Sequence, residues 1–168
     1  MKSFKIQKQK VVLLISLLLL IVVTIVCCIG RPIQTIDVHG YSNFILENDT
    51  LWFGAGYKLY RIEPDTQMAT LVYDTENVFV SFIQTDGERI YFGGDTYPTG
   101  IISKFWSIDL DSEKVLWEQK INRRLIGWLI APAPLVGEDV LIIGFRQALF
   151  TLDKYTGELK WKLEDHWF

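Results

Sequence analysis

The chain has 168 residues, 49% of them hydrophobic and 14% aromatic, and its formal net charge at pH 7 is −3. This length accommodates one domain and a short additional segment. All 20 acidic residues follow residue 30, together with only 13 of the 17 Lys and Arg, so that part of the chain has a net charge of −7. A nucleic-acid-binding protein needs a basic face, and this charge balance argues against that class.

The first 30 residues predict a basic segment followed by a membrane helix. Residues 1–10 carry four Lys and no acid, and residues 11–29 contain no charge. As a helix, this run would span the hydrocarbon core of a bilayer, which is roughly 30 Å thick. It is longer than the apolar region of a cleaved signal peptide and lacks an A-x-A-like site. We therefore predict a signal-anchor helix over residues 11–30, with a cleaved signal peptide as the alternative.

Charge around this helix predicts its orientation. The lysines lie before the helix and Arg31 is the only nearby cation after it, which places residues 1–10 in the cytoplasm and residues 31–168 outside. Cys27 and Cys28, the only cysteines, read as small apolar residues of the helix or as a site for acylation. Residues 31–40 are a linker, and no disulfide is expected beyond them.

A repeat of 44 to 46 residues organises the rest of the chain. The segment "LDKYTGELKW" (152–161) matches "IDLDSEKVLW" (108–117) and, more weakly, "IEPDTQMATL" (62–71). Upstream of each lies an acidic turn, a β-branched or aromatic run and a Gly, which predicts four short strands per unit. We place the three units at residues 41–73, 78–120 and 132–163. Four strands in 40 to 50 residues are typical of a β-propeller blade, so the fold is predicted to be all-β.

The turn between the third and fourth strands explains the motif. Asp153 can accept hydrogen bonds from the backbone of the turn, and Gly157 can adopt the positive φ that closes it. Glu113 occupies the matching place in the second unit, where a positive φ would cost about 1 kcal/mol, so we expect that turn to differ in type. Trp117 and Trp161, and less effectively Leu71, are expected to cover the edge of the next unit.

These residues resemble the repeats of the pyrroloquinoline-quinone-dehydrogenase-like (PQQ-like) propellers, whose blade ends in A-x-D-x-x-T-G-x-x-x-W. Residues 151–161 match this pattern with Thr151 in place of Ala, whereas residues 107–117 lose the Gly and residues 61–71 keep only Thr66 and a conservative Glu63. The resemblance covers about residues 41–163. It implies a propeller fold, in a family that includes dehydrogenases, the lipoprotein of outer-membrane barrel assembly and exported propellers without known chemistry.

The resemblance does not extend to a catalytic site. The dehydrogenases of this family hold a quinone with calcium, an aspartate base and aromatic and basic partners, and that set cannot be placed here. "DLDSE" (109–113) lacks the spaced ligands of a calcium loop and reads as a turn. His39 and His166 lie outside the units, and no nucleophile with a base is apparent. We therefore predict no catalytic, cofactor-binding or metal-binding residues and no cofactor.

One surface is a candidate for binding a partner. In an up-and-down blade the turn between the second and third strands shares an end with the link to the next blade. Both are long in the second unit, at residues 94–103 and 121–131. We therefore predict a partner face formed by Tyr97, Arg123, Arg124 and Trp128, since aromatic residues and Arg are enriched at protein interfaces. The alternative is that Trp128 packs between blades and the arginines are only solvated.

Three blades fall short of the four to eight or so of a closed propeller. The chain would then be part of a longer reading frame, be completed by a protein partner or by a second copy, or form an open stack. We expect a membrane-anchored, exported, non-catalytic scaffold that binds protein and does not bind nucleic acid. The alternative is the N-terminal part of a quinone-dependent dehydrogenase.

Overall fold

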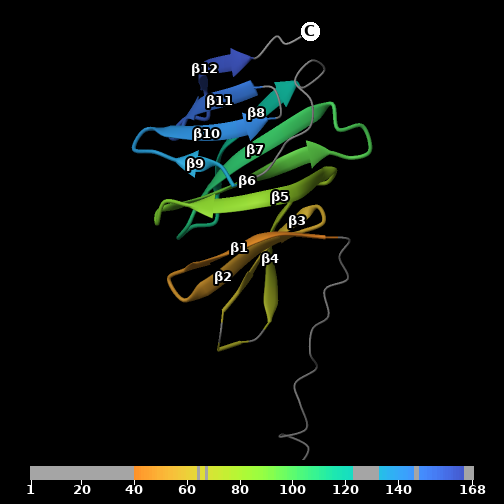
Figure 1. Ribbon diagram of the computed structural model, residues 1–168. Coiled ribbons are helices and arrows are strands. Elements are labelled where there is room, and N and C mark those ends of the chain that lie inside the picture. The colour runs from red at the N-terminus through yellow and green to blue at the C-terminus, as the bar shows by residue number, and fades with distance from the viewer. Residues whose placement is uncertain (1–39, 64, 67, 123–132, 146–147, 165–168) are drawn as a thin grey trace, which may run out of the picture. The chain divides into compact units, whose positions relative to one another are not determined.

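The computed structural model describes residues 40–63, 65–66, 68–122, 133–145 and 148–164 (Figure 1). The chain divides into two compact units, Met1–Thr35 and Ile36–Phe168, and all described residues belong to the second. They form three four-stranded antiparallel sheets and no helix, which confirms the predicted all-β architecture of three such sheets. The predicted signal anchor at residues 11–30 lies outside the described residues and stays a prediction. Within the described ranges, no helix is long and apolar enough to cross a membrane.

Each sheet follows the chain in simple up-and-down order. The first sheet contains β1 (Tyr41–Glu47), β2 (Thr50–Ala55), β3 (Lys58–Ile62) and β4 (Ala69–Asp74). The second contains β5 (Val78–Thr85), β6 (Arg89–Thr96), β7 (Ile102–Asp109) and β8 (Val115–Asn122). The third contains β9 (Leu135–Val136), β10 (Val140–Phe145), β11 (Ala148–Asp153) and β12 (Leu159–Glu164). Figure 1 shows the second sheet lying between the other two.

Local sequence accounts for the tight reversals between strands. Asn48 and Asp49 between β1 and β2 both have positive φ, as a two-residue type I′ hairpin requires, and both residue types tolerate that conformation. Gly56, between β2 and β3, also has positive φ. The strands themselves are rich in β-branched and aromatic residues, which favour pleated, half-buried surfaces.

Two hydrophobic cores hold the sheets together. The first joins the first and second sheets and contains Trp52, Leu59, Val78, Val80, Ile83, Ile90, Phe92, Trp106 and Ile108. The second joins the second and third sheets and contains Phe82, Tyr91, Phe105, Trp117, Ile121, Leu141, Ile143, Phe145, Ala148, Phe150 and Leu152. The second sheet is thus packed on both faces by its neighbours, so that β6 and β7 carry runs of consecutive buried residues, whereas most residues of β8 are exposed.

A side chain also links β1 and β5, the first strands of the first two sheets. The amide of Asn43 in β1 donates to the Ile83 carbonyl at 2.7 Å and accepts from the Ile83 N–H at 2.8 Å. This pair of bonds imitates one step of a strand ladder, because a side-chain amide carries the same donor and acceptor as a peptide group. Asn43 can occupy this position because β1 has an irregularity between Tyr41 and Phe44.

The position of a β-bulge decides where the repeated motif places its last residue. In the second and third sheets the register shifts immediately beyond the turn, so that Trp117 pairs with Ser107 and Trp161 with Thr151. In the first sheet the shift comes later, between Leu59 and Tyr60. Thr70 then pairs with Arg61, and Leu71 pairs with Tyr60 on the opposite face. The expectation that Leu71 covers the next sheet was therefore wrong, because a one-residue shift moves a side chain to the other face.

The expectation that the Glu113 turn differs from the Gly157 turn was also wrong. Glu113 has a φ of 56° and Gly157 a φ of 74°. Their N–H groups make the same hydrogen bond, to the carbonyls of Asp109 and Asp153, at 2.9 and 2.8 Å. Glu113 is held in this conformation by the tight turn, and its side chain also reaches the first sheet. These contacts offset the free-energy cost of its positive φ.

Candidate protein-contact face

Three aromatic side chains gather at the end of the sheets that carries the turns between second and third strands. Tyr57 follows β2, Tyr97 follows β6 and Phe79 lies in β5. The ring centroids of Tyr57 and Phe79 are 6.3 Å apart in an edge-to-face arrangement, and those of Tyr57 and Tyr97 are 6.4 Å apart. We call Tyr57, Phe79 and Tyr97 the aromatic face.

Backbone hydrogen bonds fix this group to the link between β4 and β5. The Tyr57 carbonyl accepts from the N–H of Thr75 at 2.8 Å and from its hydroxyl at 2.7 Å. The N–H of Tyr97 donates to the Asn77 carbonyl at 2.8 Å. The turns after β2 and β6 therefore share an end with the link between the first two sheets, as the up-and-down order of the strands predicts.

The turn that carries Tyr97 is closed by its own residues. The Gly100 N–H donates to the Thr96 carbonyl at 2.6 Å, and the Thr96 hydroxyl donates to the Ile102 carbonyl at 3.0 Å. This leaves the Tyr97 side chain on the outside, where 66% of its surface is exposed. A large aromatic side chain is thus presented to solvent from an ordered turn.

Only one of the four predicted partner-face residues can be placed. Tyr97 lies on the aromatic face, whereas Arg123, Arg124 and Trp128 lie outside the described residues, so their grouping with Tyr97 stays a prediction. Sequence reasoning missed Tyr57 and Phe79. The signal for Tyr57 was present, because "GAGYK" (54–58) is the second-to-third-strand turn of the first unit, the same place in the blade from which Tyr97 was selected.

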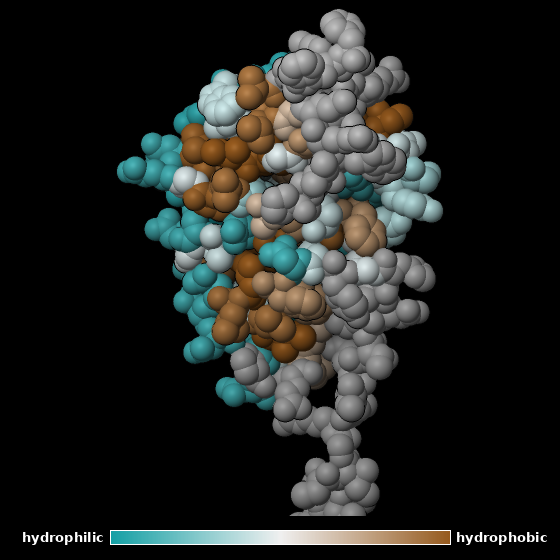
Figure 2. Space-filling view, viewed as in Figure 1, coloured by the Kyte–Doolittle hydropathy of each residue, from teal (hydrophilic) through white to brown (hydrophobic). Residues whose placement is uncertain are grey.

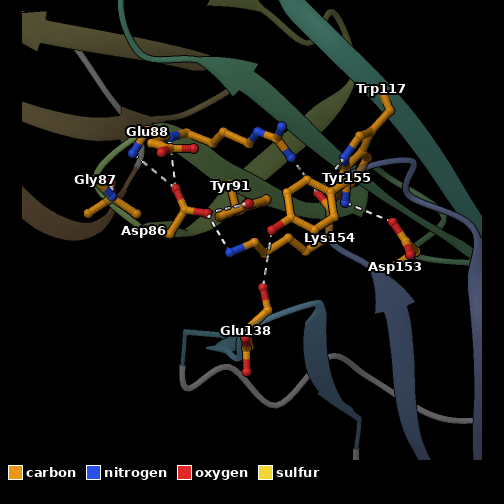
Figure 3. A network of polar contacts seen from close by, with 11 residues as sticks. Asp86, Gly87, Glu88, Tyr91, Trp117, Glu138, Asp153, Lys154 and Tyr155 are labelled. Atoms are coloured by element: carbon orange, nitrogen blue, oxygen red, sulfur yellow. Dashed lines mark hydrogen bonds and ion pairs between the residues drawn. The ribbon is translucent and has the colours of Figure 1, made fainter.

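A polar network joins the second and third sheets at their other end (Figure 3). Asp86, in the turn between β5 and β6, accepts a hydrogen bond from the Tyr91 hydroxyl at 2.9 Å. Its carboxylate also lies 3.2 Å from the Lys154 ammonium, in the turn between β11 and β12. The Lys154 carbonyl accepts from the Trp117 indole at 3.0 Å and from Arg89 at 3.3 Å.

The charges of this network follow from its contacts. Burial alone raises the pKa of Asp86, but hydrogen bonds from Tyr91, from the backbone of Glu88 and from Lys154 outweigh it, so this pKa lies below its ordinary value. Burial, and then the hydrogen bond to Asp86, raise the pKa of Tyr91. Asp86 therefore stays ionised and Tyr91 stays neutral across the physiological pH range. Groups with such fixed charges are suited to a structural contact.

The junction between the first and second sheets contains ion pairs in place of the Asp86–Tyr91–Lys154 network. Arg61 in β3 lies 2.7 Å from Glu113 in the turn between β7 and β8, and 2.5 Å from Glu63 on its own sheet. All three side chains are partly exposed, at 28%, 31% and 47% respectively. Solvent screens such pairs, so this contact contributes less than a buried one.

The acidic segment 109–113 behaves as a turn. The Asp109 carboxylate accepts from the Ser112 hydroxyl at 2.6 Å and from its N–H at 2.8 Å. These two bonds, the hydroxyl first, lower the pKa of Asp109. In the part of the chain that the structure describes, no three His, Cys, Asp or Glu side chains are grouped so that they could hold a metal ion. The absence of a cofactor remains a prediction from sequence.

Solved structures share this fold. No protein-family model and no curated protein matches the sequence. BamB from Moraxella catarrhalis superposes with a TM-score of 0.57 at 15% identity, covering 73% of this chain and 37% of BamB. A europium-containing methanol dehydrogenase and the quinohemoprotein alcohol dehydrogenase from Comamonas testosteroni each give a TM-score of 0.52, at 14% and 18% identity.

Each match covers most of this chain but less than half of the matched protein. The two dehydrogenase matches cover 80% and 76% of this chain but only 27% and 21% of the dehydrogenases. A structure of the mitotic checkpoint complex matches with a TM-score of 0.54 at 14% identity, covering 82% of this chain and 47% of the matched chain. The chain thus spans less than half of each of these proteins. At this level of identity the similarity concerns the fold, and it confirms the predicted resemblance to PQQ-like propellers in that respect.

Proposed function

We propose that this chain is an exported scaffold without catalytic activity of its own, anchored by residues 11–30, which binds a protein partner through the aromatic face. The single observation that carries the proposal is the exposed Tyr97 ring, which lies near Tyr57 at one end of the first and second sheets. Aromatic rings offer a large contact area with little entropy to lose, and they dominate the energetics of many protein interfaces.

The remaining support comes from the neighbours and from charge. One similar fold occurs in a chain of the mitotic checkpoint complex, which is by its name a protein assembly. Solved structures of similar fold thus include at least one chain that belongs to a protein assembly. The membrane anchor and the exported location rest on the lysines of residues 1–10 and the uncharged run that follows them. The net negative charge of the rest of the chain is consistent with a protein partner and disfavours nucleic acid.

Site-specific photo-crosslinking tests this proposal. A photoreactive phenylalanine analogue is introduced at Tyr97 in the full-length chain and, as a matched control, at Met68, which is 59% exposed in the turn between β3 and β4. We expect one discrete crosslinked protein from position 97 and none from position 68. The product at position 97 should be lost in a Tyr57→Ala background and kept in a Glu76→Gln background. Equal crosslinking at both positions would overturn the assignment of the aromatic face.

The similarity to two dehydrogenases favours a second candidate, namely that the chain is the N-terminal part of a quinone-dependent dehydrogenase. The resemblance implies that such enzymes hold a metal ion and a quinone with ligands from several blades, and within the described residues no three His, Cys, Asp or Glu side chains are grouped so that they could hold a metal ion. Calcium-dependent reduction of a dye by the full-length chain, in the presence of added pyrroloquinoline quinone, would support the enzyme and contradict the scaffold.

A further inference from the structure

The two ends of the sheets differ in charge. The up-and-down order places the turns after β1, β3, β5, β7, β9 and β11 at one end, and each contains an Asp or a Glu. In the shared view of Figures 1 and 2, the turns after β1, β5 and β9 lie at the left, where the surface is mainly hydrophilic. The turns after β2 and β6 lie at the other end and carry Tyr57 and Tyr97 but no charged residue. Glu76, in the link between β4 and β5, adds one exposed acid there, so the aromatic face lies at the less charged end.

The turn after β6 presents apolar side chains to solvent. Residues 96–103 contain no charge. Tyr97 is 66% exposed, and Ile101 and Ile102 are 38% and 36% exposed, with the exposed Pro98 between them. We call residues 97–102 the apolar turn. Apolar side chains that are exposed together mark a contact site for a protein or a membrane.

The chain enters the first sheet at this same end. Gly40 immediately precedes β1, and its carbonyl accepts from the N–H of Gly56, in the turn after β2, at 3.1 Å. Gly40 has a φ of 133°, and a Cβ at this position would lie 2.7 Å from the ring of Phe79. Both the backbone conformation and the close approach therefore require glycine. Gly40 thus brings the chain into the first sheet beside the aromatic face.

The length of the preceding segment limits the distance from the predicted anchor. Nine residues, 31–39, separate residues 11–30 from Gly40. Nine residues span no more than about 30 Å even when fully extended. In an anchored chain, the end that carries the aromatic face is therefore held next to the bilayer. Negatively charged lipids would repel the acidic turns of the opposite end.

We propose that the apolar turn contacts the lipid surface of the membrane in which residues 11–30 are anchored. This inference rests on the anchor of the proposed function and adds a second, peripheral contact with the same membrane. Tyrosine rings favour the level of the lipid headgroups, and apolar side chains reach about 5 to 10 Å into the boundary with the acyl chains. Because residues 96–103 carry no charge, no ionised side chain has to be desolvated in this contact. A protein bound to the aromatic face would then itself lie at the membrane surface.

Fluorescence quenching by labelled lipid tests this contact. The full-length chain, with a single fluorescent acridone amino acid, is reconstituted into phosphatidylcholine vesicles that contain lipid with a nitroxide near the start of the acyl chain. The fluorophore replaces Ile101 or, as a matched control, Leu116, which is 44% exposed at the opposite end of the second sheet. We expect quenching at position 101 to exceed quenching at position 116 at least about threefold. Equal quenching at the two positions would overturn the proposal.

A second set of variants tests the apolar side chains themselves. With the fluorophore at Thr99, Ile101→Ser together with Ile102→Ser should lower the quenching to the level of position 116. Val115→Ser together with Leu116→Ser removes similar apolar surface at the other end and should leave the quenching at Thr99 unchanged. Circular dichroism checks that each variant is folded. Where the first double substitution unfolds the sheet, Ile101→Ser alone gives the same comparison.

Flotation of the vesicles in a sucrose gradient separates failure of this inference from failure of the anchor. We expect the full-length chain to float with the vesicles. Flotation without preferential quenching at position 101 would overturn the lipid contact and leave the anchored scaffold intact. A chain that remains at the bottom would overturn the anchor and, with it, this inference. A photoreactive residue at position 101 that crosslinks to protein in cells, without quenching by the labelled lipid, would assign the apolar turn to a protein partner and would also overturn it.

Discussion

The two junctions between neighbouring sheets are built from the same repeat but hold together by different chemistry. Between the second and third sheets, the Trp117 ring lies over Gly157 while its indole bonds to the Lys154 carbonyl, and Asp86 pairs with Lys154 beside it. Between the first and second sheets, apolar packing is joined by the partly exposed Arg61–Glu113 pair and by the Asn43 amide. The comparison teaches that conserved strand order does not require a conserved contact, because apolar faces supply most of the free energy at both junctions.

The largest difference should appear at the last residue of the motif. Trp117→Ala removes a buried ring and an indole hydrogen bond, and we expect a loss of about 3 to 5 kcal/mol in the free energy of unfolding. Leu71→Ala, at the matching sequence position, removes a side chain that is 47% exposed, and we expect roughly 0.5 kcal/mol or less. Urea unfolding followed by circular dichroism measures both. Similar losses would show that the bulge does not separate the roles of the two residues.

Substitutions of the residue at the end of each turn should differ strongly in their effect on the free energy of unfolding. Gly157→Ala should cost about 2 to 4 kcal/mol, from the left-handed backbone and from displacement of the Trp117 ring. Glu113→Gly should be close to neutral, because relief of about 1 kcal/mol of backbone cost offsets an ion pair worth roughly 0 to 1 kcal/mol. Hydrogen exchange of the β11 amides reports the first change and that of β7 the second. A neutral Gly157→Ala would contradict the close approach of the ring.

The Asp86 carboxylate should make the second junction sensitive to acid. Asp86→Asn removes the pairing with Lys154, and we expect about 1 to 3 kcal/mol of destabilisation at pH 7. Since the pKa of Asp86 is lowered in the folded state, its contribution is complete above the unfolded pKa of about 3.9 and is lost as the pH falls through the folded pKa. Unfolding of both proteins from pH 7 down to pH 3 should show their stabilities converging below about pH 4. A gap that stays constant over this range would rule out the carboxylate as its source.

The first junction should show the smallest response, and one that salt suppresses. Arg61→Ala removes the contacts with Glu113 and Glu63, and we expect about 1 kcal/mol or less at low ionic strength. At about 1 M salt, where the screening length is roughly 3 Å, most of this difference should vanish. Thermal unfolding at both ionic strengths gives the comparison. A loss that is large and independent of salt would instead point to packing of the arginine stem.

Much of the fold was predictable from local sequence. Acid-containing turns at a regular spacing, alternating with aromatic and β-branched runs, indicate strand lengths and reversals, and both are local properties of the chain. The turn at Asp153 was predicted in detail, and its carboxylate accepts from the N–H groups of Tyr155 and Thr156 at 2.9 Å. Those bonds, together with that from Lys160, lower the pKa of Asp153 to about 2.

The parts that could not be predicted depend on contacts between distant residues. The amino acid at position 71 does not indicate the bulge that turns Leu71 outward, because strand register is decided by how a whole face of the sheet packs. The turn at Glu113 has the same geometry as the turn at Gly157. This geometry imposes a positive φ on Glu113, although a residue with a side chain favours a negative φ. Tyr57 and Phe79 join Tyr97 only because the link between sheets bonds to both turns. Arg123, Arg124 and Trp128 remain predictions from sequence alone.

The different placement of the bulge in the first sheet has a consequence for how tandem duplications diverge. After a blade is copied, a two-residue displacement of the bulge transfers the terminal residue of the motif from an interior contact to the exterior, without any change in its own codon. Selection on that residue then relaxes, and a tryptophan can drift to leucine at no cost to folding. An alignment by residue letters alone would record such a change as decay of the motif, whereas the strand pairing shows that the last residue of the motif lies on the other face.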